Sequence, residues 1–300
     1  RRRLGWGLSD FGDTRIVKSS DKVVFNELTQ RRGRESIHIF TGYHSHPVTW
    51  AAYRELRRSE ALLGAYSESF DVRGLLGKLR MIKSRFKTLQ DRSRLDFVLN
   101  LGDLSRDWFL RSGISQERLF PYAYFTEQPR VDLNSVVSNR PFRIIFIGQL
   151  IHRKGVDLLI RALSTLKDQN FELDIVGGGL NFAKYQQLVA ECNLSDQISF
   201  CGVVPNENIS ELLIGADLHV LPSRWDGWGA VINEALMSGV PSLASDRCGG
   251  ASLLQGDCGA VFESGNVKSL AKHLRIRIEE GQRTKEQRTV LIDWARSLTG

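Results

Sequence analysis

The stretch DLHVLPSRWDGWGAVINEALMSGVPSLASD, residues 217–246, decides the fold of this chain. Its apolar run at residues 218–221 is typical of a buried parallel strand. Two closely spaced glycines in DGWG, residues 226–229, predict a turn because glycine tolerates unusual backbone angles. Helically spaced apolar residues follow, and Gly239 with the proline after it ends that helix. A second strand is predicted from Val240, so the stretch has the strand–helix–strand order of a parallel α/β sheet.

Two acids in this stretch, Asp226 and Glu234, indicate a binding site. A helix that begins directly after a glycine turn directs free backbone N–H groups and a positive dipole end at the turn, where an anion such as a diphosphate fits. Carboxylates accept hydrogen bonds from hydroxyl groups. We expect Asp226 to hold sugar hydroxyls and Glu234 to hold ribose hydroxyls. The alternative is a helix-capping aspartate and an exposed glutamate, but the neighbouring residues favour the binding site.

The stretch resembles the signature of the retaining glycosyltransferases of family 4, the glycosyl transferases group 1. That signature is an acid, seven residues and a glutamate after a strand that ends in Pro-Ser; Asp226 stands where the family usually has glutamate. Residues 142–163 resemble the first strand, glycine loop and helix of the family's donor domain, and residues 171–179 and 198–204 resemble later strands. The resemblance implies an α/β GT-B fold, with two facing Rossmann-like domains built on parallel sheets. It also implies sugar transfer from a nucleotide diphosphate sugar with retention, without a bound cofactor or metal.

The resemblance also implies which residues bind the donor. Lys154 matches a lysine that neutralises the diphosphate, and Arg153 would replace an arginine that is common where Gln149 stands. With Asp226, Lys154 is the candidate catalytic residue of this half. The family's loop at Gly249 and Gly250 contributes backbone N–H groups near the donor sugar. The predicted donor-binding residues are Gly148, Gln149, Arg153, Lys154, Asp226, Gly227, Trp228, Gly229 and Glu234.

Two histidines in the first half are further candidates. Residues 42–47 (GYHSHP) follow a predicted strand at residues 36–41. Loops beyond the carboxyl ends of parallel strands are where such folds bind ligands. The resemblance implies a catalytic histidine near the transferred sugar, which is either His44 or His46. The alternative for each is an ordinary loop histidine beside a helix N-terminus.

Other functional classes are disfavoured. The GGG at residues 177–179 lacks the last glycine of a dinucleotide fingerprint, because Phe182 stands there, so NAD binding is not expected. Four cysteines without a CxxC pair argue against zinc and disulfides and favour a reducing cytosol. No apolar run approaches the roughly 20 residues of a membrane span, and the arginines at residues 1–3 lead into no apolar leader segment.

The charge differs between the two predicted domains, residues 1–139 on the acceptor side and residues 140–300 on the donor side. Residues 1–139 hold 24 lysines and arginines against 16 acids, a net charge of +8, whereas residues 140–300 hold 17 against 18, a net charge of −1. Residues 125–141 lack periodicity and contain two prolines, which is typical of a linker. The basic first half favours an anionic partner.

Residues 72–89 (VRGLLGKLRMIKSRFKTL) combine helically spaced apolar residues with six basic residues and no acid. A basic amphipathic helix suits an anionic membrane surface, and the alternative is a packed helix with a solvated basic face. Nucleic acid is not expected, since no recognition motif accompanies the charge. We therefore expect a cytoplasmic protein, peripheral at the inner face of the plasma membrane.

Together these features predict a retaining glycosyltransferase with a glycan or lipid-linked acceptor, in bacterial cell-surface polysaccharide synthesis. The alternatives are a non-catalytic nucleotide-sugar-binding protein and a GT-B sugar-nucleotide epimerase. The first half is short for an acceptor domain, and residues 291–298 resemble only the start of a helix that crosses back to that domain. We therefore expect the family's first βα units, and the rest of this helix, to lie outside the chain.

Overall fold

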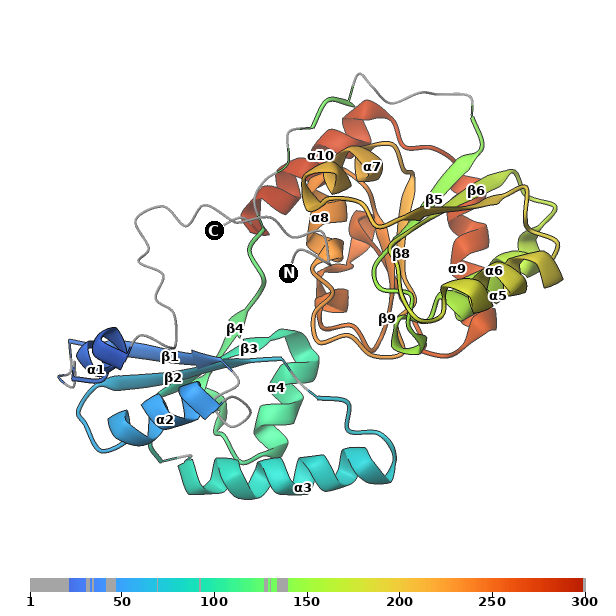
Figure 1. The fold of residues 1–300 in the computed structure, drawn as a ribbon. Helices are drawn as coiled ribbons and strands as arrows, with labels where there is room; N and C mark the ends of the chain where they lie inside the picture. Colours follow the sequence, from blue (N-terminus) through green and yellow to red (C-terminus); the bar gives the residue numbers. More distant parts are fainter. Residues whose placement is uncertain are drawn as a thin grey trace. The chain divides into compact units, whose positions relative to one another are not determined.

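The chain divides into two compact α/β units, with the division between Ala123 and Tyr124. Figure 1 shows the helices and strands of each unit. Tyr124 belongs to the second unit because its backbone oxygen accepts a hydrogen bond from Asn233, and its ring meets Trp228 edge-on. The sequence predicts the domain boundary later, at residue 139. The computed structural model describes residues 22–30, 33, 35–41, 47–68, 70–91, 93–126, 129, 131–133 and 140–298.

The N-terminal unit is a parallel sheet of four strands in the order β1-β2-β3-β4. Helices alternate with the strands, as the sequence predicts. Along each strand successive side chains point to opposite faces; Phe40, Leu63 and Val98 are buried on one face, while Ile37 and Phe120 are exposed. The described elements are α1 (Lys22–Gln30), β1 (Ile37–Thr41), α2 (Pro47–Leu56), β2 (Leu62–Ser67), α3 (Gly74–Asp91), β3 (Phe97–Leu101), α4 (Gly102–Arg111) and β4 (Leu119–Tyr122).

The C-terminal unit is a parallel sheet of six strands in the order β10-β9-β8-β5-β6-β7. The strand order reverses between β5 and β8, so the sheet is doubly wound, as in a Rossmann-like fold. The expected α/β class with parallel sheets is therefore present in both units. The described elements are β5 (Phe142–Ile147), α5 (Val156–Leu163), β6 (Phe171–Val176), α6 (Phe182–Glu191), β7 (Ile198–Gly202), α7 (Ile209–Ile214), β8 (Leu218–Leu221), α8 (Val231–Met237), β9 (Ser242–Ser245), β10 (Gly259–Phe262), α9 (Val267–Glu280) and α10 (Lys285–Ala295).

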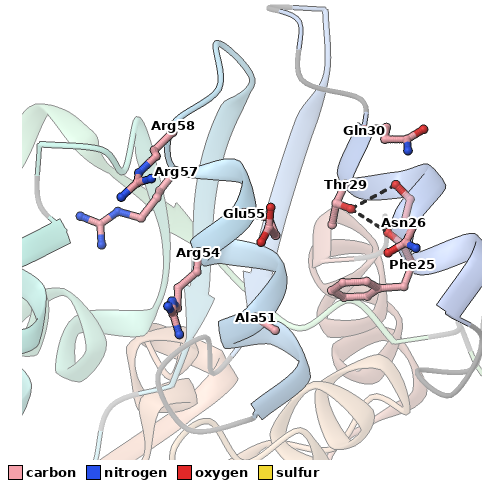
Figure 2. Close-up of a pocket in the computed structure, with 9 residues that line it drawn as sticks. All are labelled: Phe25, Asn26, Thr29, Gln30, Ala51, Arg54, Glu55, Arg57 and Arg58. Atoms are coloured by element: carbon pink, nitrogen blue, oxygen red, sulfur yellow. Dashed lines mark hydrogen bonds between the residues drawn. The ribbon is translucent and has the colours of Figure 1, made fainter.

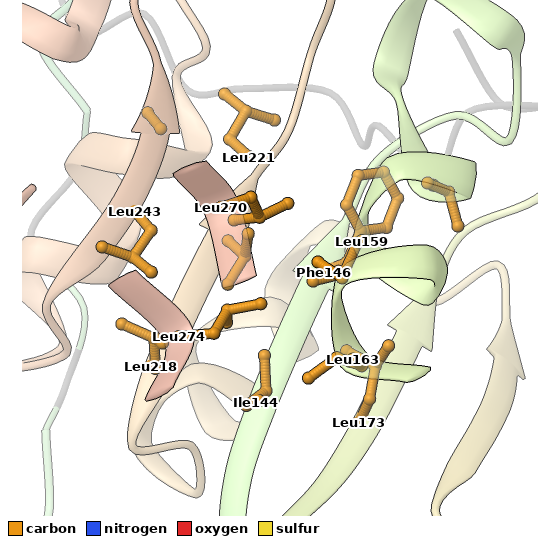
Figure 3. Packing of buried hydrophobic residues seen from close by; sticks show 14 of the residues in the cluster. Ile144, Phe146, Leu159, Leu163, Leu173, Leu218, Leu221, Leu243, Leu270 and Leu274 are labelled. Atoms are coloured by element: carbon orange, nitrogen blue, oxygen red, sulfur yellow. The ribbon is translucent and has the colours of Figure 1, made fainter. Parts of the chain in front are cut away.

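Helices cover both faces of this larger sheet. Ile144 and Phe146 of β5 lie with Leu159 of α5 in one buried cluster, part of which Figure 3 shows. Ile145 between them points the other way, into a second cluster with Leu213 of α7. A parallel sheet buried on both faces needs strands that are apolar throughout rather than alternating. This explains why the strongest strand predictions are the continuous apolar runs of the second half.

A buried charge cluster fixes the C-terminal helix to the amino end of β8. Asp217, just before β8, accepts hydrogen bonds from Arg140 at 2.6 Å and from Arg288 of α10 at 3.2 Å. Arg288 also donates to the backbone oxygens of Ile214 and Ala216 at 2.9 and 2.7 Å, and its side chain is 2% exposed. Buried charges need partners of this kind, since desolvation is otherwise unfavourable.

Replacing Arg288 by methionine tests this cluster. We expect Arg288→Met to lower the free energy of unfolding by about 3 kcal/mol, because it leaves Asp217 and two carbonyl oxygens under-bonded in the interior. Urea unfolding followed by circular dichroism measures the change. The exposed Arg275 serves as the control, and a loss no larger for Arg288→Met than for Arg275→Met would contradict the account.

Candidate active site

The loops after β5 and β8 meet at the point where the strand order reverses. In open α/β sheets this crevice beyond the carboxyl ends of the strands is where ligands bind. The two loops are joined by a backbone hydrogen bond, in which Arg224 N–H donates to Arg153 O at 2.8 Å. Gly155 allows the approach: its φ is +72°, and a Cβ there would overlap the Pro222 carbonyl oxygen. The topology thus brings residues about seventy positions apart in the chain to one place.

Lys154 and Asp226 form an ion pair at this place. Lys154 Nζ lies 2.5 Å from Asp226 Oδ2, and only 14% and 11% of the two side chains are exposed. Arg153 adds a second cation, with Nη1 at 3.8 Å from Asp226 Oδ1 and at 2.8 Å from the Trp225 oxygen. Ser223 Oγ lies 3.4 Å from Oδ2 of Asp226. Two predicted catalytic residues are therefore in direct contact.

Glu234 of α8 is the other acid of the predicted signature. Its side chain is half-buried, and burial raises the pKa of the Glu234 carboxyl. Within the described part of the chain, no residue pairs with this carboxylate or donates a hydrogen bond to it. Withdrawal of a carboxylate from water costs free energy unless hydrogen-bond donors replace the water. Glu234 is therefore suited to accept hydrogen bonds from a ligand.

The glycine loop after β9 holds the turn that carries Asp226. Asp226 N–H donates to Arg247 O at 2.9 Å, Gly249 N–H donates to Asp226 O at 3.1 Å, and Gly250 N–H donates to Trp228 O at 2.8 Å. A Cβ at Gly249 would overlap the carbonyl oxygen of Gly227. The two glycine amides, expected to face the donor sugar, are thus already used within the chain. Their role in this structure is to position the turn.

The remaining predicted donor residues occupy different environments. Gly148 directly follows β5, Gln149 is exposed, and Gly229 has a φ of +83° before α8. The Trp228 side chain is 2% exposed and donates from Nε1 to Asn233 Oδ1 at 2.8 Å. Packing accounts for this indole, so only the backbone at Trp228 is left as a donor contact. His44 and His46 lie outside the described residues.

The family model for glycosyl transferases group 1 matches residues 132–297, more than half of the chain and all of the elements described above for the second unit. The chain belongs to this family. The resemblance found at Asp226 and Glu234 is therefore confirmed at the level of the family.

Relatives of known name cover only part of this group 1 chain. The amylovoran biosynthesis glycosyltransferase AmsK of Erwinia amylovora is 29% identical over 153 residues, which is 48% of this chain and 37% of the relative. A GDP-mannose-dependent alpha-(1-6)-phosphatidylinositol monomannoside mannosyltransferase of Mycobacterium tuberculosis is 25% identical over 243 residues, 78% of this chain and 58% of the relative. The chain thus spans less than two thirds of the length of these relatives.

Solved structures of low sequence identity share the fold. The lipopolysaccharide outer core galactosyltransferase WaaB matches with a TM-score of 0.73 at 16% identity, covering 92% of this chain and 74% of that one. Anabaena Alr3699/HepE in complex with UDP matches with a TM-score of 0.71 at 19% identity, covering 92% and 78%. The expected GT-B fold class of this group 1 chain is confirmed.

A pocket of about 850 Å³ lies in the N-terminal unit of the group 1 chain, between α1 and α2. Figure 2 shows Phe25 of α1 pointing toward α2, and Thr29 Oγ1 bonded to the backbone oxygens of Phe25 and Asn26, both at 3.1 Å. None of the predicted donor residues lines it. This pocket is therefore separate from the candidate site at the loops after β5 and β8. The lining residues are Phe25, Asn26, Thr29, Gln30, Ala51, Arg54, Glu55, Arg57 and Arg58.

Across the described ranges, no group of three or more histidine, cysteine or acidic side chains is arranged to hold a metal ion. In the same part of the chain, no helix has the length and apolar character needed to cross a bilayer.

His219, a fully buried polar residue near the candidate site, is not among the site residues predicted from the sequence. It lies in β8, with Nδ1 2.7 Å from Ser242 Oγ of β9. Burial, assisted by the charge of Lys154, lowers the pKa of His219 to about 3. The imidazole is therefore neutral at physiological pH and adds no positive charge beside Lys154. A histidine inside the apolar run LHVL, residues 218–221, is the feature of the sequence that could have indicated a buried polar residue.

We expect His219 to make the fold sensitive to acid. Its pKa is about 3 in the folded chain and near 6.5 when exposed, so the unfolded chain binds the extra proton between these values. The free energy of unfolding should fall as the pH drops from about 6.5 towards about 3. His219→Gln should show a smaller fall than the parent in urea titrations across this window. The exposed His152→Gln variant is the control, and equal falls in all three proteins would contradict the assignment.

Proposed function

We propose that the protein transfers a glycosyl group from a nucleotide diphosphate sugar to a glycan or lipid-linked acceptor, with retention at the anomeric carbon. The observation that carries the proposal is the Lys154–Asp226 ion pair at the strand-order reversal. The half-buried Glu234 follows eight residues later in the chain and has no partner among the described residues. A cation and two acids at this position provide separate contacts for phosphate, sugar and ribose. Family membership and the names of the relatives support the same reaction.

In the proposed mechanism, the donor diphosphate replaces Asp226 as the ion-pair partner of Lys154. Lys154 neutralises the negative charge that grows on the departing nucleoside diphosphate, and Arg153 contributes a second positive charge. Asp226, released from the pair, accepts hydrogen bonds from hydroxyls of the donor sugar. Each acidic and basic group then has a new partner of opposite polarity. We assign no nucleophile to the chain.

Glu234 is proposed to hold the ribose hydroxyls of the nucleotide. A half-buried carboxylate to which no described residue donates a hydrogen bond gains most from two hydroxyl donors. We further propose that no metal ion takes part, because Lys154 and Arg153 provide the charge neutralisation that a metal supplies in other sites. Added chelator should then leave turnover unchanged.

The names of the relatives and structural neighbours support a class of substrate. The mannosyltransferase relative is GDP-mannose-dependent by name, whereas the HepE neighbour holds UDP. These names support a nucleoside diphosphate donor and do not select its base. AmsK is named for amylovoran synthesis, which supports a bacterial cell-surface polysaccharide or its lipid-linked precursor as the acceptor.

The proposed location is the cytoplasm, peripheral to the inner face of the plasma membrane. Cys192, Cys201, Cys248 and Cys258 are all free thiols in this structure, as suits a reducing compartment. Exposed apolar side chains of α3, such as Leu75 and Phe86, together with the basic residues of this helix support the membrane contact.

Turnover with defined donors tests the proposal. The chain is incubated with UDP-, GDP- and ADP-sugars and a bacterial lipid extract, and released nucleoside diphosphate and the anomeric configuration of the product are measured. We expect one donor class to react, with retention. Lys154→Gln should reduce the rate about a hundredfold to a thousandfold, because a charge that stabilises the transition state is lost.

The controls separate the rival functions. Lys154→Arg keeps the cation and should retain more activity than Lys154→Gln, while the exposed Lys167→Gln should match the parent. Conversion of the donor sugar without release of nucleotide would identify an epimerase instead. Donor binding without turnover under all conditions would identify a non-catalytic binding protein.

A further inference from the structure

The helix α3, Gly74–Asp91, meets the rest of its unit through a stripe of small and polar side chains. Thr88 and Asp91 are 2% and 1% exposed, and Gly77 packs so closely that a Cβ would overlap the backbone of Val72. Arg57 Nη1 lies 3.6 Å from Asp91 Oδ1 and fixes the end of the helix. Met81 is the apolar member of the stripe and packs against the core. An isolated amphipathic helix would bury its large apolar side chains. Helix α3 instead buries its small and polar side chains against the rest of the unit.

The opposite face of α3 carries its large apolar side chains. Leu75, Leu79, Ile82, Phe86 and Leu89 form a stripe about 80° wide on an ideal helix. A contiguous apolar stripe left in water is unfavourable and marks an interaction surface. The exposed fractions, which include Leu76 beside the stripe, are 76% for Leu75, 70% for Leu76, 54% for Leu79, 52% for Ile82, 67% for Phe86 and 37% for Leu89.

Basic side chains border this stripe on both sides. Helical geometry places Lys78 and Arg85 on one flank and Lys83 and Lys87 on the other. The helix contains no acid before its last residue, Asp91. Among the described residues, no acid forms an ion pair with Lys78, Lys83 or Arg85. The surface is thus an apolar centre with a basic border.

We propose that α3 docks the protein on an anionic phospholipid surface. The helix lies parallel to the membrane, with the stripe at the boundary between headgroups and acyl chains. The long stems of the lysines and arginines cover apolar surface while their charges reach lipid phosphates. The charge pattern selects this occupant: a second copy of α3 against the stripe would bring two basic borders together, which is repulsive. The proposal does not depend on the identity of the donor or on turnover.

Vesicle sedimentation of the full chain tests the proposal. The probes are vesicles of phosphatidylcholine mixed with phosphatidylglycerol, and vesicles of phosphatidylcholine alone. We expect binding to the mixed vesicles that weakens at high salt, because ions screen the surface potential. Lys78→Gln/Lys83→Gln/Arg85→Gln should reduce partitioning roughly a hundredfold, about fivefold for each charge. Leu79→Ser/Ile82→Ser/Phe86→Ser should reduce it by at least about tenfold.

Matched control variants replace three basic or three large apolar side chains on the C-terminal unit. Lys184→Gln/Lys268→Gln/Lys272→Gln and Leu180→Ser/Ile276→Ser/Val290→Ser replace exposed side chains there and should bind as the parent does. All altered side chains are exposed, and far-ultraviolet circular dichroism confirms folding. Equal binding to both kinds of vesicle would overturn the proposal, as would equal losses in the α3 and control variants. Self-association that the serine variant abolishes, without vesicle binding by the parent, would assign the stripe to a second copy instead.

Discussion

The ion pair between Lys154 and Asp226 depends on the reversal of strand order between β5 and β8. Because all six strands are parallel, their carboxyl ends lie at one edge, and the reversal leaves a crevice there. Gly155 and the Pro222 carbonyl fit together only because the glycine has no side chain. The backbone of Gly249 then holds the Asp226 turn from the other side. Each element of the proposed donor site is positioned by this arrangement of loops.

The two ends of β8 show how the unit separates stability from function. At the amino end, Asp217 is saturated by Arg140 and by Arg288, which is itself buried and bonded to carbonyl oxygens. At the carboxyl end, Asp226 is paired with a lysine that a phosphate can attract, and Glu234 has no described partner. A fully bonded carboxylate such as that of Asp217 gains nothing from a ligand, whereas the carboxyl end offers exchangeable or open hydrogen-bonding groups. The physical difference between the two acids lies in how completely each is bonded.

Local patterns in the sequence predicted most of the elements, because burial of parallel strands requires continuous apolar runs such as Phe142–Ile147. The two glycines of DGWG also located the turn at Asp226. Long-range contacts could not be predicted from local patterns. Lys154, the partner of Asp226, is 72 residues away in the chain. The amides of Gly249 and Gly250 donate hydrogen bonds to the turn that carries Asp226. The orientation of α3 was open as well, since the sequence shows an apolar face but not that Thr88 and Asp91 occupy the interior instead.

Calorimetric titration of the chain with UDP, GDP and ADP tests the central claim, that a nucleotide binds at the reversal of strand order. The account predicts that one nucleotide binds, that chelator does not change its affinity, and that Glu234→Ala abolishes the heat of binding. The exposed Glu279→Ala variant should bind as the parent does. Binding to Glu234→Ala with the parent's affinity, or no binding of any of the three nucleotides to the parent chain, would contradict the account.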